Sequence, residues 1–324
     1  MYKTFSLFVL IFCCFLSANS TTPIEDIYIR DPFILADEDS GNYYMYCSST
    51  LITEEGQHLG GVGVYKSKDL KNWEDMVRVC TVPKDNWITG QIWAPEVHKY
   101  KGKYYLFATI NSDIEWKGEK EGWGAKYVYR GTQIFSSDSP EGPFEALSRM
   151  PATPIDEMAL DGTLWSEDGT PYMVYCHEWV QIGDGEMKAI RLSDDLSETI
   201  GNPVRLFNAS AAKWSTGGMQ GNYVSDGCYL YRTKNGKLIM IWSSFMDGDY
   251  ALGLAESTTG KVEGPWRQKD EPIFKKNGGH GMIFKDFDGN LRLVLHMPNS
   301  PSSMERAHLF DLEDTGDTIT LKPD

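Results

Sequence analysis

The chain has 324 residues, a formal net charge of −15 at neutral pH, and 13% aromatic residues, ten of them tryptophan. So acidic a chain repels nucleic-acid phosphates and anionic membrane headgroups, and we expect neither as a partner. Aromatic rings pack between sheets and also provide flat faces for sugar rings, which keeps a carbohydrate partner open.

Residues 1–20 have the pattern of a secretory signal peptide. A lysine precedes the apolar run FSLFVLIFCCFL, and the small residues Ala18 and Ser20 stand where a signal peptidase reads. The run is too short to span a membrane. Its cysteines do not follow a small residue, which makes a lipoprotein the weaker interpretation. We expect cleavage and export, to the medium or the periplasm, with a mature chain of residues 21–324.

One arrangement of residues occurs five times along the mature chain. An acidic or polar residue precedes a strand-like run, a turn with glycine, and a second strand-like run, and two further strand-like segments complete each unit. The five units begin near Asp31, Trp93, Asp161, Asp226 and His280. Strand-only repeats of this length are typical of propellers, because one blade cannot bury its own faces but a ring of blades can. We therefore predict an all-β fold, a single five-bladed β-propeller over residues 21–324.

The geometry of a propeller brings the first residues of the innermost strands together. All first strands run in the same direction along the axis, so the five residues that begin the units converge on one mouth. The second strand is antiparallel and returns to that mouth. The residues it adds are Ser48, Ser49, Asn111, His177, Glu178, Ser243, Ser244 and His296.

Three of the converging residues are aspartates, and their role has two interpretations. Most aspartates beside glycine satisfy turn amides, and we assign Asp168 and Asp288 to that class because both lie in hairpin turns. Asp31, Asp161 and Asp226 instead crowd like charges together, which raises at least one pKa. Paired-carboxylate catalysis requires such a difference, so the pattern favours a catalytic site over a structural one.

The mature chain keeps Cys47, Cys80, Cys176 and Cys228. Three of them lie in inner-strand patterns, where cysteine behaves as a small apolar residue, so we expect buried free thiols. No CxxC spacing occurs, which argues against a zinc site.

Several of these motifs together resemble glycoside hydrolase family 43. They are IRDPFIL around Asp31, WAPEV from Trp93, LDGTLW with Asp161, and GGHG with His280. The resemblance covers nearly the whole mature chain. It implies an inverting glycosidase on a five-bladed propeller that acts on arabinose- and xylose-containing glycans. It also implies that Asp31 is the general base and that Asp161 orients it and tunes the pKa of the acid.

The sequence departs from the family at the proton donor. The family has glutamate before Gly-Pro or Ala-Pro at the start of blade four, where this chain has Asp226 before Gly227 and Cys228. Asp226 is shorter by one methylene, about 1.5 Å of reach. Either Asp226 is the acid, or Glu178 at the same mouth takes the role. A surface glutamate is an equally good interpretation of Glu178.

Other residues have paired interpretations. The resemblance implies a Ca²⁺ on the propeller axis with His280, although calcium prefers several oxygen ligands, and a buried histidine bonded near the base is the alternative. Trp93 and Phe33, which flank the first residues of their units, are the expected sugar-binding walls. Arg306 resembles a substrate-binding arginine of the family, or else forms a surface ion pair.

Two functions from different classes follow. The first is an exported enzyme, an exo-acting α-L-arabinofuranosidase or β-xylosidase, that needs no cofactor and works as a monomer on a carbohydrate substrate. The second is a propeller that binds carbohydrate but has lost its acid. Asp31 and Asp161 favour the enzyme, because a binding protein gains nothing from crowded carboxylates.

Overall fold

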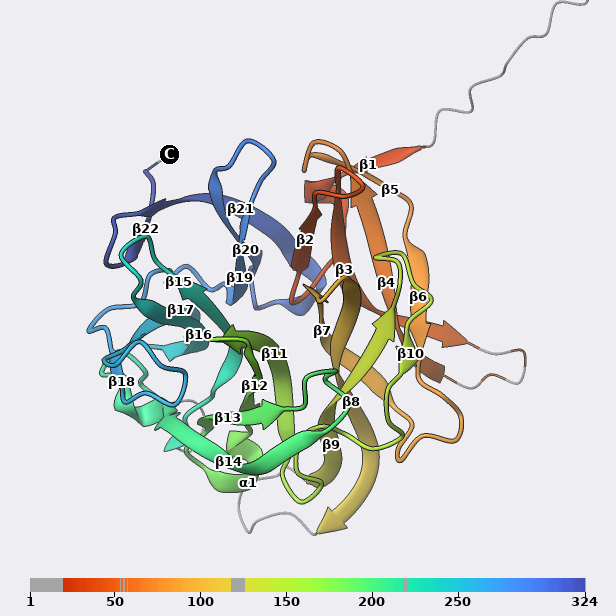
Figure 1. The fold of residues 1–324 in the computed structure, drawn as a ribbon, viewed down its shortest axis with the longest axis horizontal. Coiled ribbons are helices and arrows are strands. Elements are labelled where there is room, and N and C mark those ends of the chain that lie inside the picture. Colours follow the sequence, from red (N-terminus) through yellow and green to blue (C-terminus); the bar gives the residue numbers. More distant parts are fainter. Residues whose placement is uncertain are drawn as a thin grey trace, which may run out of the picture.

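The computed structural model describes residues 20–52, 54, 56, 58–117, 126–217 and 221–323. Five antiparallel sheets stand around a common axis, seen end-on in Figure 1. This confirms the predicted five-bladed β-propeller. The predicted signal peptide lies outside the described residues except for its last position, Ser20. Within the described ranges, no helix is long and apolar enough to cross a membrane.

Each blade contains four strands that follow one another in the chain from the axis outward. The strands are β2 (Phe33–Asp37), β3 (Asn42–Ile52), β4 (His58–Ser67) and β5 (Asn72–Glu74) in blade 1; β7 (Gln91–Tyr100), β8 (Lys103–Lys117), β9 (Tyr127–Ser137) and β10 (Glu145–Ala146) in blade 2; β11 (Ala159–Glu167), β12 (Thr170–His177), β13 (Glu186–Leu192) and β14 (Thr199–Asn208) in blade 3; β15 (Asp226–Arg232), β16 (Leu238–Met246), β17 (Asp249–Ser257) and β18 (Trp266–Gln268) in blade 4; and β19 (Gly279–Lys285), β20 (Leu291–Met297), β21 (Arg306–Asp314) and β22 (Ile319–Leu321) in blade 5.

Blade 1 carries two strands beyond the predicted four. Strand β1 (Thr21–Pro23) pairs with β5, and β6 (Val77–Thr81) pairs with β4. The helical segments are short and lie between strands. They are α1 (Trp179–Ile182) and the 3₁₀ turns η1 (Ile24–Asp26), η2 (Ala209–Ala211) and η4 (Ser302–Met304).

The hydrophobic core lies between neighbouring blades. Large aromatic side chains fill it, among them Trp73, Trp242 and Tyr175, all fully buried. The rings of Trp214 and Trp242 lie 5.0 Å apart between centroids. Cys47, Cys80, Cys176 and Cys228 are buried free thiols, as the strand pattern predicted.

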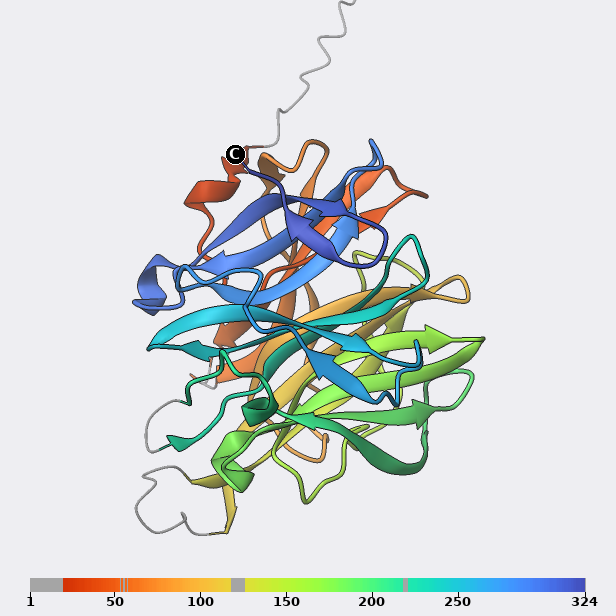
Figure 2. The same ribbon diagram turned by 90° about the vertical axis from the view of Figure 1, so that its left-hand side faces the viewer.

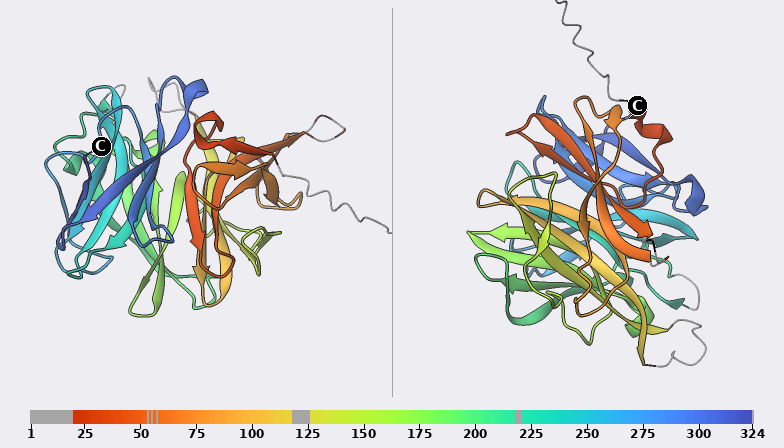
Figure 3. Two further views of the ribbon diagram at one scale, coloured as in Figure 1. Left: turned by 90° about the horizontal axis from the view of Figure 1, so that it is seen from above. Right: turned by 90° about the vertical axis from the view of Figure 1, so that its right-hand side faces the viewer.

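The first and last blades lie side by side and close the ring, as Figures 2 and 3 show. Tyr28, just before β2, forms an antiparallel bridge with Arg306 at the start of β21. The amide of Ile29 donates to the carbonyl of Glu305 at 3.3 Å. The two ends of the propeller are thus joined by backbone pairing beside Asp31.

One residue at the start of each innermost strand has a left-handed backbone. These residues are Asp31 (φ 49°), Ala94 (φ 41°), Asp161 (φ 55°), Gly227 (φ 54°) and His280 (φ 49°). In blades 2 to 5 a β-bulge accompanies this residue. Bulges bend a strand and redirect its side chains, and strained backbone of this kind is concentrated at functional sites.

These left-handed positions correct the predicted alignment of the repeats. Asp31, Asp161 and His280 are equivalent, as expected, but Trp93 and Asp226 each stand one residue before the equivalent positions, Ala94 and Gly227. Asp226 therefore reaches the axis from a different backbone position than the other two aspartates. Asp226 and Gly227 are adjacent, and the spacing of motifs does not show which of two neighbouring residues takes the left-handed position, so the sequence placed Asp226 in register.

Candidate active site

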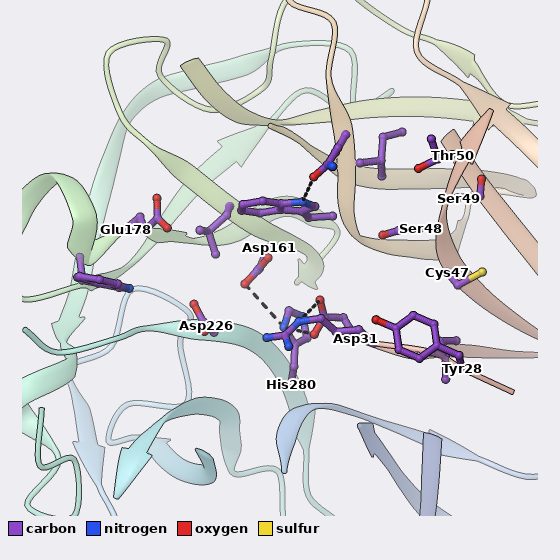
Figure 4. A pocket seen from close by; sticks show the side chains of 17 residues that line it. Tyr28, Asp31, Cys47, Ser48, Ser49, Thr50, Asp161, Glu178, Asp226 and His280 are labelled. Atoms are coloured by element: carbon purple, nitrogen blue, oxygen red, sulfur yellow. Dashed lines mark hydrogen bonds and ion pairs between the residues drawn. The ribbon is translucent and has the colours of Figure 1, made fainter. Parts of the chain in front are cut away.

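A cavity of about 610 Å³ opens at the mouth where the innermost strands begin. Residues from all five blades line it, and Figure 4 shows Asp31, Asp161, Asp226, Glu178 and His280 facing its centre. The rest of the lining comes from both sides of this group. It includes Tyr28, Arg30, Ser48, Ser49, Thr50, Gln91, Trp93 and Trp179.

Asp31 lies between two histidines and an arginine. Its Oδ1 is 3.1 Å from Nδ1 of His280 and 3.2 Å from Nδ1 of His296. Its amide also donates to Nδ1 of His296, and its Oδ2 lies 3.6 Å from Nε of Arg30. Burial alone raises the pKa of Asp31, but the charge of His280 and the contacts with His296 and Arg30 outweigh it and hold that pKa well below its ordinary value. This carboxylate is therefore ionised at neutral pH, which is the state that a general base requires.

Asp161 lies on the other side of His280. Its Oδ2 accepts from the amide of Gly227 at 3.0 Å and lies 3.9 Å from Nδ1 of His280. Its own amide donates to Oγ1 of Thr109 at 2.9 Å. Burial raises the pKa of Asp161 to about 7; His280 and the Gly227 amide oppose the shift, and the charges of Asp226 and Asp31 add to it. Asp161 thus exchanges a proton near neutral pH.

Asp226 has one close polar partner in the described structure, the hydroxyl of Tyr250, which donates to its Oδ2 at 3.0 Å. Burial raises the pKa of Asp226, although His280 and the Tyr250 hydrogen bond lower it. No cation forms an ion pair with this carboxyl among the described residues. Asp226 is therefore suited to hold a proton at the pH where Asp31 has lost its own.

Glu178 stands at the N-terminal end of α1 and forms an ion pair with Arg130. The Arg130 guanidinium also donates through Nε to Oδ1 of Asn111 at 2.8 Å and stacks 4.4 Å from the Trp93 ring centre. Burial raises the pKa of Glu178, and Arg130 acts against this by stabilising the ionised form. Arg130 thus holds the Trp93 ring, which forms a wall of the cavity, and also the Glu178 carboxylate beside that ring.

Gly227 is required where it stands. Its φ of +54° favours glycine, and a Cβ there would lie 2.7 Å from Cγ of the His280 ring. The close approach lets the amide of Gly227 reach Asp161 while His280 fills the space behind. Because Gly227 has no side chain, the blades that carry Asp161 and Asp226 can pack closely against His280.

The motifs and the cavity agree with what known proteins show. The family model described as glycosyl hydrolases family 43 matches residues 20–320. The chain belongs to this family. It is thus a member of a family of glycoside hydrolases on five-bladed propellers.

Solved structures and curated relatives agree with family 43. A structure titled endo-arabinase from Bacteroides thetaiotaomicron shares 39% identity at a TM-score of 0.79, covering 91% of this chain and 97% of that one. The extracellular endo-α-(1→5)-L-arabinanase 1 of Bacillus subtilis is 24% identical over 78% of this chain and 71% of its own length. The α-L-arabinofuranosidase 43 of Humicola insolens is 24% identical over 62% of this chain. The match spans only 41% of that enzyme's length.

The family resemblance also implied a calcium ion at His280, and the donor set does not fit one. Nδ1 of His280 is directed at the carboxylates of Asp31 and Asp161, with which it forms ion pairs. Calcium takes six to eight oxygen ligands. The residues that the structure describes contain no group of three or more His, Cys, Asp or Glu placed to hold a metal ion. We therefore derive no step through a metal.

Two expected substrate contacts lie away from the cavity. Phe33 lies along β2, where its ring contacts those of His98 (5.2 Å) and Tyr229 (6.3 Å), and it lines a separate cavity. Arg306 donates to the carbonyls of Glu25 and Glu305 and so helps to close the ring. Of the expected sugar contacts, only Trp93 lines the site.

Sequence reasoning missed Arg30, Tyr250 and Arg130. Arg30 directly precedes Asp31, and this adjacency was the available signal. Tyr250 and Arg130 lie in third strands, β17 and β9, and reach the site through contacts with Asp226 and Glu178. No pattern along the chain marks such contacts.

Proposed function

We propose that this protein is an exported, inverting glycoside hydrolase that acts on arabinose- or xylose-containing glycans, as an exo-acting α-L-arabinofuranosidase or β-xylosidase. The observation that carries the proposal is the pair of carboxyls with opposite pKa shifts in one cavity. The pKa of Asp31 is lowered and that of Asp226 is raised. Inversion uses such a pair: one carboxylate deprotonates water on one face of the sugar, and one carboxylic acid protonates the leaving oxygen.

In this proposal Asp31 is the general base and Asp226 the general acid. Asp161, whose Oδ2 lies 3.9 Å from Nδ1 of His280, orients the base through that histidine and raises the pKa of the acid when it is itself ionised. Asp226 is the preferred donor because its close partner is a neutral hydroxyl, whereas Glu178 is paired with a cation that favours the ionised form. Glu178 remains the alternative donor.

Trp93 supplies the aromatic wall, and Ser48, Ser49 and Thr50 supply hydroxyls on the side of blade 1. A cavity of this volume accommodates a small number of sugar units, which favours removal of terminal residues. Export is supported by the pattern of residues 1–20 and by the Bacillus relative, which is named extracellular.

A second candidate is an endo-arabinanase. Two relatives that match most of this chain carry that description, the Bacteroides structure and the Bacillus enzyme. Digestion of linear arabinan separates the two candidates. Monosaccharide as the first product supports exo action, and a ladder of oligosaccharides supports endo action.

The deciding experiment measures hydrolysis of aryl α-L-arabinofuranoside, aryl β-xyloside and arabino-oligosaccharides by the purified protein and by Asp31→Asn. We expect turnover by the wild type, and a loss of about 10²–10⁴-fold in kcat in the variant. The anomer released first, followed by NMR, tests inversion. Binding of sugar without any cleavage would instead identify a carbohydrate-binding propeller.

The proposed proton transfers are carried by carboxyl groups, so the reaction needs no cofactor. We expect activity to survive dialysis against EDTA. A loss that added Ca²⁺ restores would show that a metal is required.

A further inference from the structure

Arg30, Tyr28 and Glu305 form a polar cluster at the seam between blades 1 and 5. Arg30 and Tyr28 line the cavity beside Asp31, and Figure 4 shows Tyr28 at its rim. Glu305 comes from the other end of the chain, just before β21, and is fully buried. Of the three, only Arg30 enters the proposed mechanism, through its effect on the pKa of Asp31.

Glu305 binds both of the other residues. Arg30 donates to its Oε1 through Nη1, and the hydroxyl of Tyr28 donates to its Oε2 at 3.1 Å. A fully buried carboxylate is costly unless it is paired and hydrogen-bonded, and here both oxygens have donors. The cost of burying Glu305 therefore depends on Arg30 and Tyr28 standing where they do.

The ion pair with Glu305 occupies only some of the N–H donors of Arg30. A guanidinium has five N–H donors in a fixed plane, and one nitrogen is committed to Glu305. Nε lies 3.6 Å from Oδ2 of Asp31, and the side chain is 44% exposed at the cavity. The remaining N–H groups of Arg30 thus lie beside the proposed base, Asp31. The ion pair with Glu305 holds them in one orientation.

We propose that Arg30 donates to hydroxyls of the sugar whose bond is cleaved, and that Glu305 is the positioning residue that holds Arg30 and Tyr28 for this task. The ligand class is a neutral sugar. Four carboxyls, Asp31, Asp161, Glu178 and Asp226, line the same cavity, and they disfavour an anionic one. The inference rests on the proposed function for its substrate, and extends it to a residue from blade 5.

The test compares Glu305→Gln, Arg30→Met, the double variant and Tyr28→Phe with the wild type. The readouts are kcat and KM on arabino-oligosaccharides and thermal unfolding. Binding of the same sugars is followed by tryptophan fluorescence, for which Trp93 and Trp179 lie in the cavity. Lys101→Met, an exposed lysine that pairs with Asp194 far from the cavity, is the control for loss of a positive charge.

We expect Glu305→Gln and Arg30→Met each to raise KM and weaken binding by about 10–100-fold, the range for a lost hydrogen bond to a charged group, with a smaller change in kcat. The double variant should be no weaker than the worse single variant, because the two residues act as one unit. Tyr28→Phe removes only a hydroxyl, so it carries the test if Glu305→Gln fails to fold, and a rise in KM of about threefold or more is expected.

Two outcomes would overturn this inference and leave the proposed function standing. One is a lower unfolding temperature in Glu305→Gln and Arg30→Met with unchanged KM and binding, which would make the cluster a structural clamp. The other is additive losses in the double variant. If the wild type binds these sugars without cleaving them, the proposed function is wrong, but the binding measurements still test this inference. If the wild type neither binds nor cleaves them, the proposed function and this inference are both wrong.

Discussion

Oδ1 of Asp31, which precedes the first blade, lies 3.1 Å from Nδ1 of His280, which opens the last. The pair joins the proposed base to a histidine whose pKa is raised, because Asp31, Asp161 and Asp226 together outweigh the effect of its burial. A protonated His280 stabilises ionised Asp31. The charge state of the site is therefore set by contacts between blades.

The identity of the proton donor is tested by Asp226→Asn and Glu178→Gln, two isosteric changes at neighbouring carboxyls. We expect Asp226→Asn to lower kcat by about 10²–10⁴-fold on arabino-oligosaccharides, and by far less on an aryl glycoside whose leaving group needs no proton. Glu178→Gln should show a smaller loss that does not depend on the leaving group. The reverse pattern would assign the acid to Glu178.

Two carboxyl groups with opposite pKa shifts, Asp31 and Asp226, should set the two limits of the pH profile of activity. Asp31 has a lowered pKa and stays ionised as the pH falls, so activity should persist below the ordinary range of a carboxylate. Asp226 has a raised pKa and must be protonated, so activity should be lost as the pH rises through that value. Above about pH 7, where Asp161 is ionised, Asp161→Asn removes a neighbouring negative charge, and the alkaline limb of kcat/KM should move to lower pH. An unmoved limb would show that Asp161 does not tune the acid.

Asp161 should also reduce the stability of the fold above neutral pH. Its folded pKa of about 7 exceeds the ordinary value of 3.8, so the folded state binds the proton more tightly than the unfolded state. Its contribution to stability is full below pH 3.8 and is lost as the pH rises through 7. We expect Asp161→Asn to raise the unfolding temperature at pH 8 by about 2–5 °C. The difference should vanish near pH 4, and a constant difference would contradict the assignment.

Gly227→Ala should damage the site. The variant strains a left-handed residue, at a cost of about 1–2 kcal/mol, and places a methyl group 2.7 Å from the His280 ring. Gly289→Ala is the matched control, because φ is +82° there and no atom lies within 4 Å of the added Cβ. We expect both variants to unfold at lower temperature, and only Gly227→Ala to lose most of its kcat. Equal activity in the two would mean that the contact with His280 is relieved without consequence.

The sequence predicted the ring and most of its central residues, because strand repeats with similar first residues leave few alternatives to a propeller. Asp31, Asp161, Glu178 and His280 reach the cavity as expected. The register of Asp226 was predicted one residue off, because motif spacing does not show that Gly227, and not Asp226, takes the left-handed position.

The remaining differences arise from contacts between distant segments. Phe33 flanks Asp31 in the chain, yet strand alternation directs its ring onto His98 and Tyr229. Arg306 is turned toward backbone carbonyls by the pairing of Tyr28 with β21. The position of Phe33 depends on contacts with blades 2 and 4, and that of Arg306 on ring closure. Local sequence encodes neither.

The backbone pairing that closes the ring also sets when the site comes into being during synthesis. Asp31 leaves the ribosome early, whereas His280 and His296, its partners across the seam, emerge only as the fifth blade is made. The proposed base has no histidine beside it until the seam forms. Catalytic competence therefore arrives in a single late step, and enzyme activity can serve as a direct readout of completed assembly.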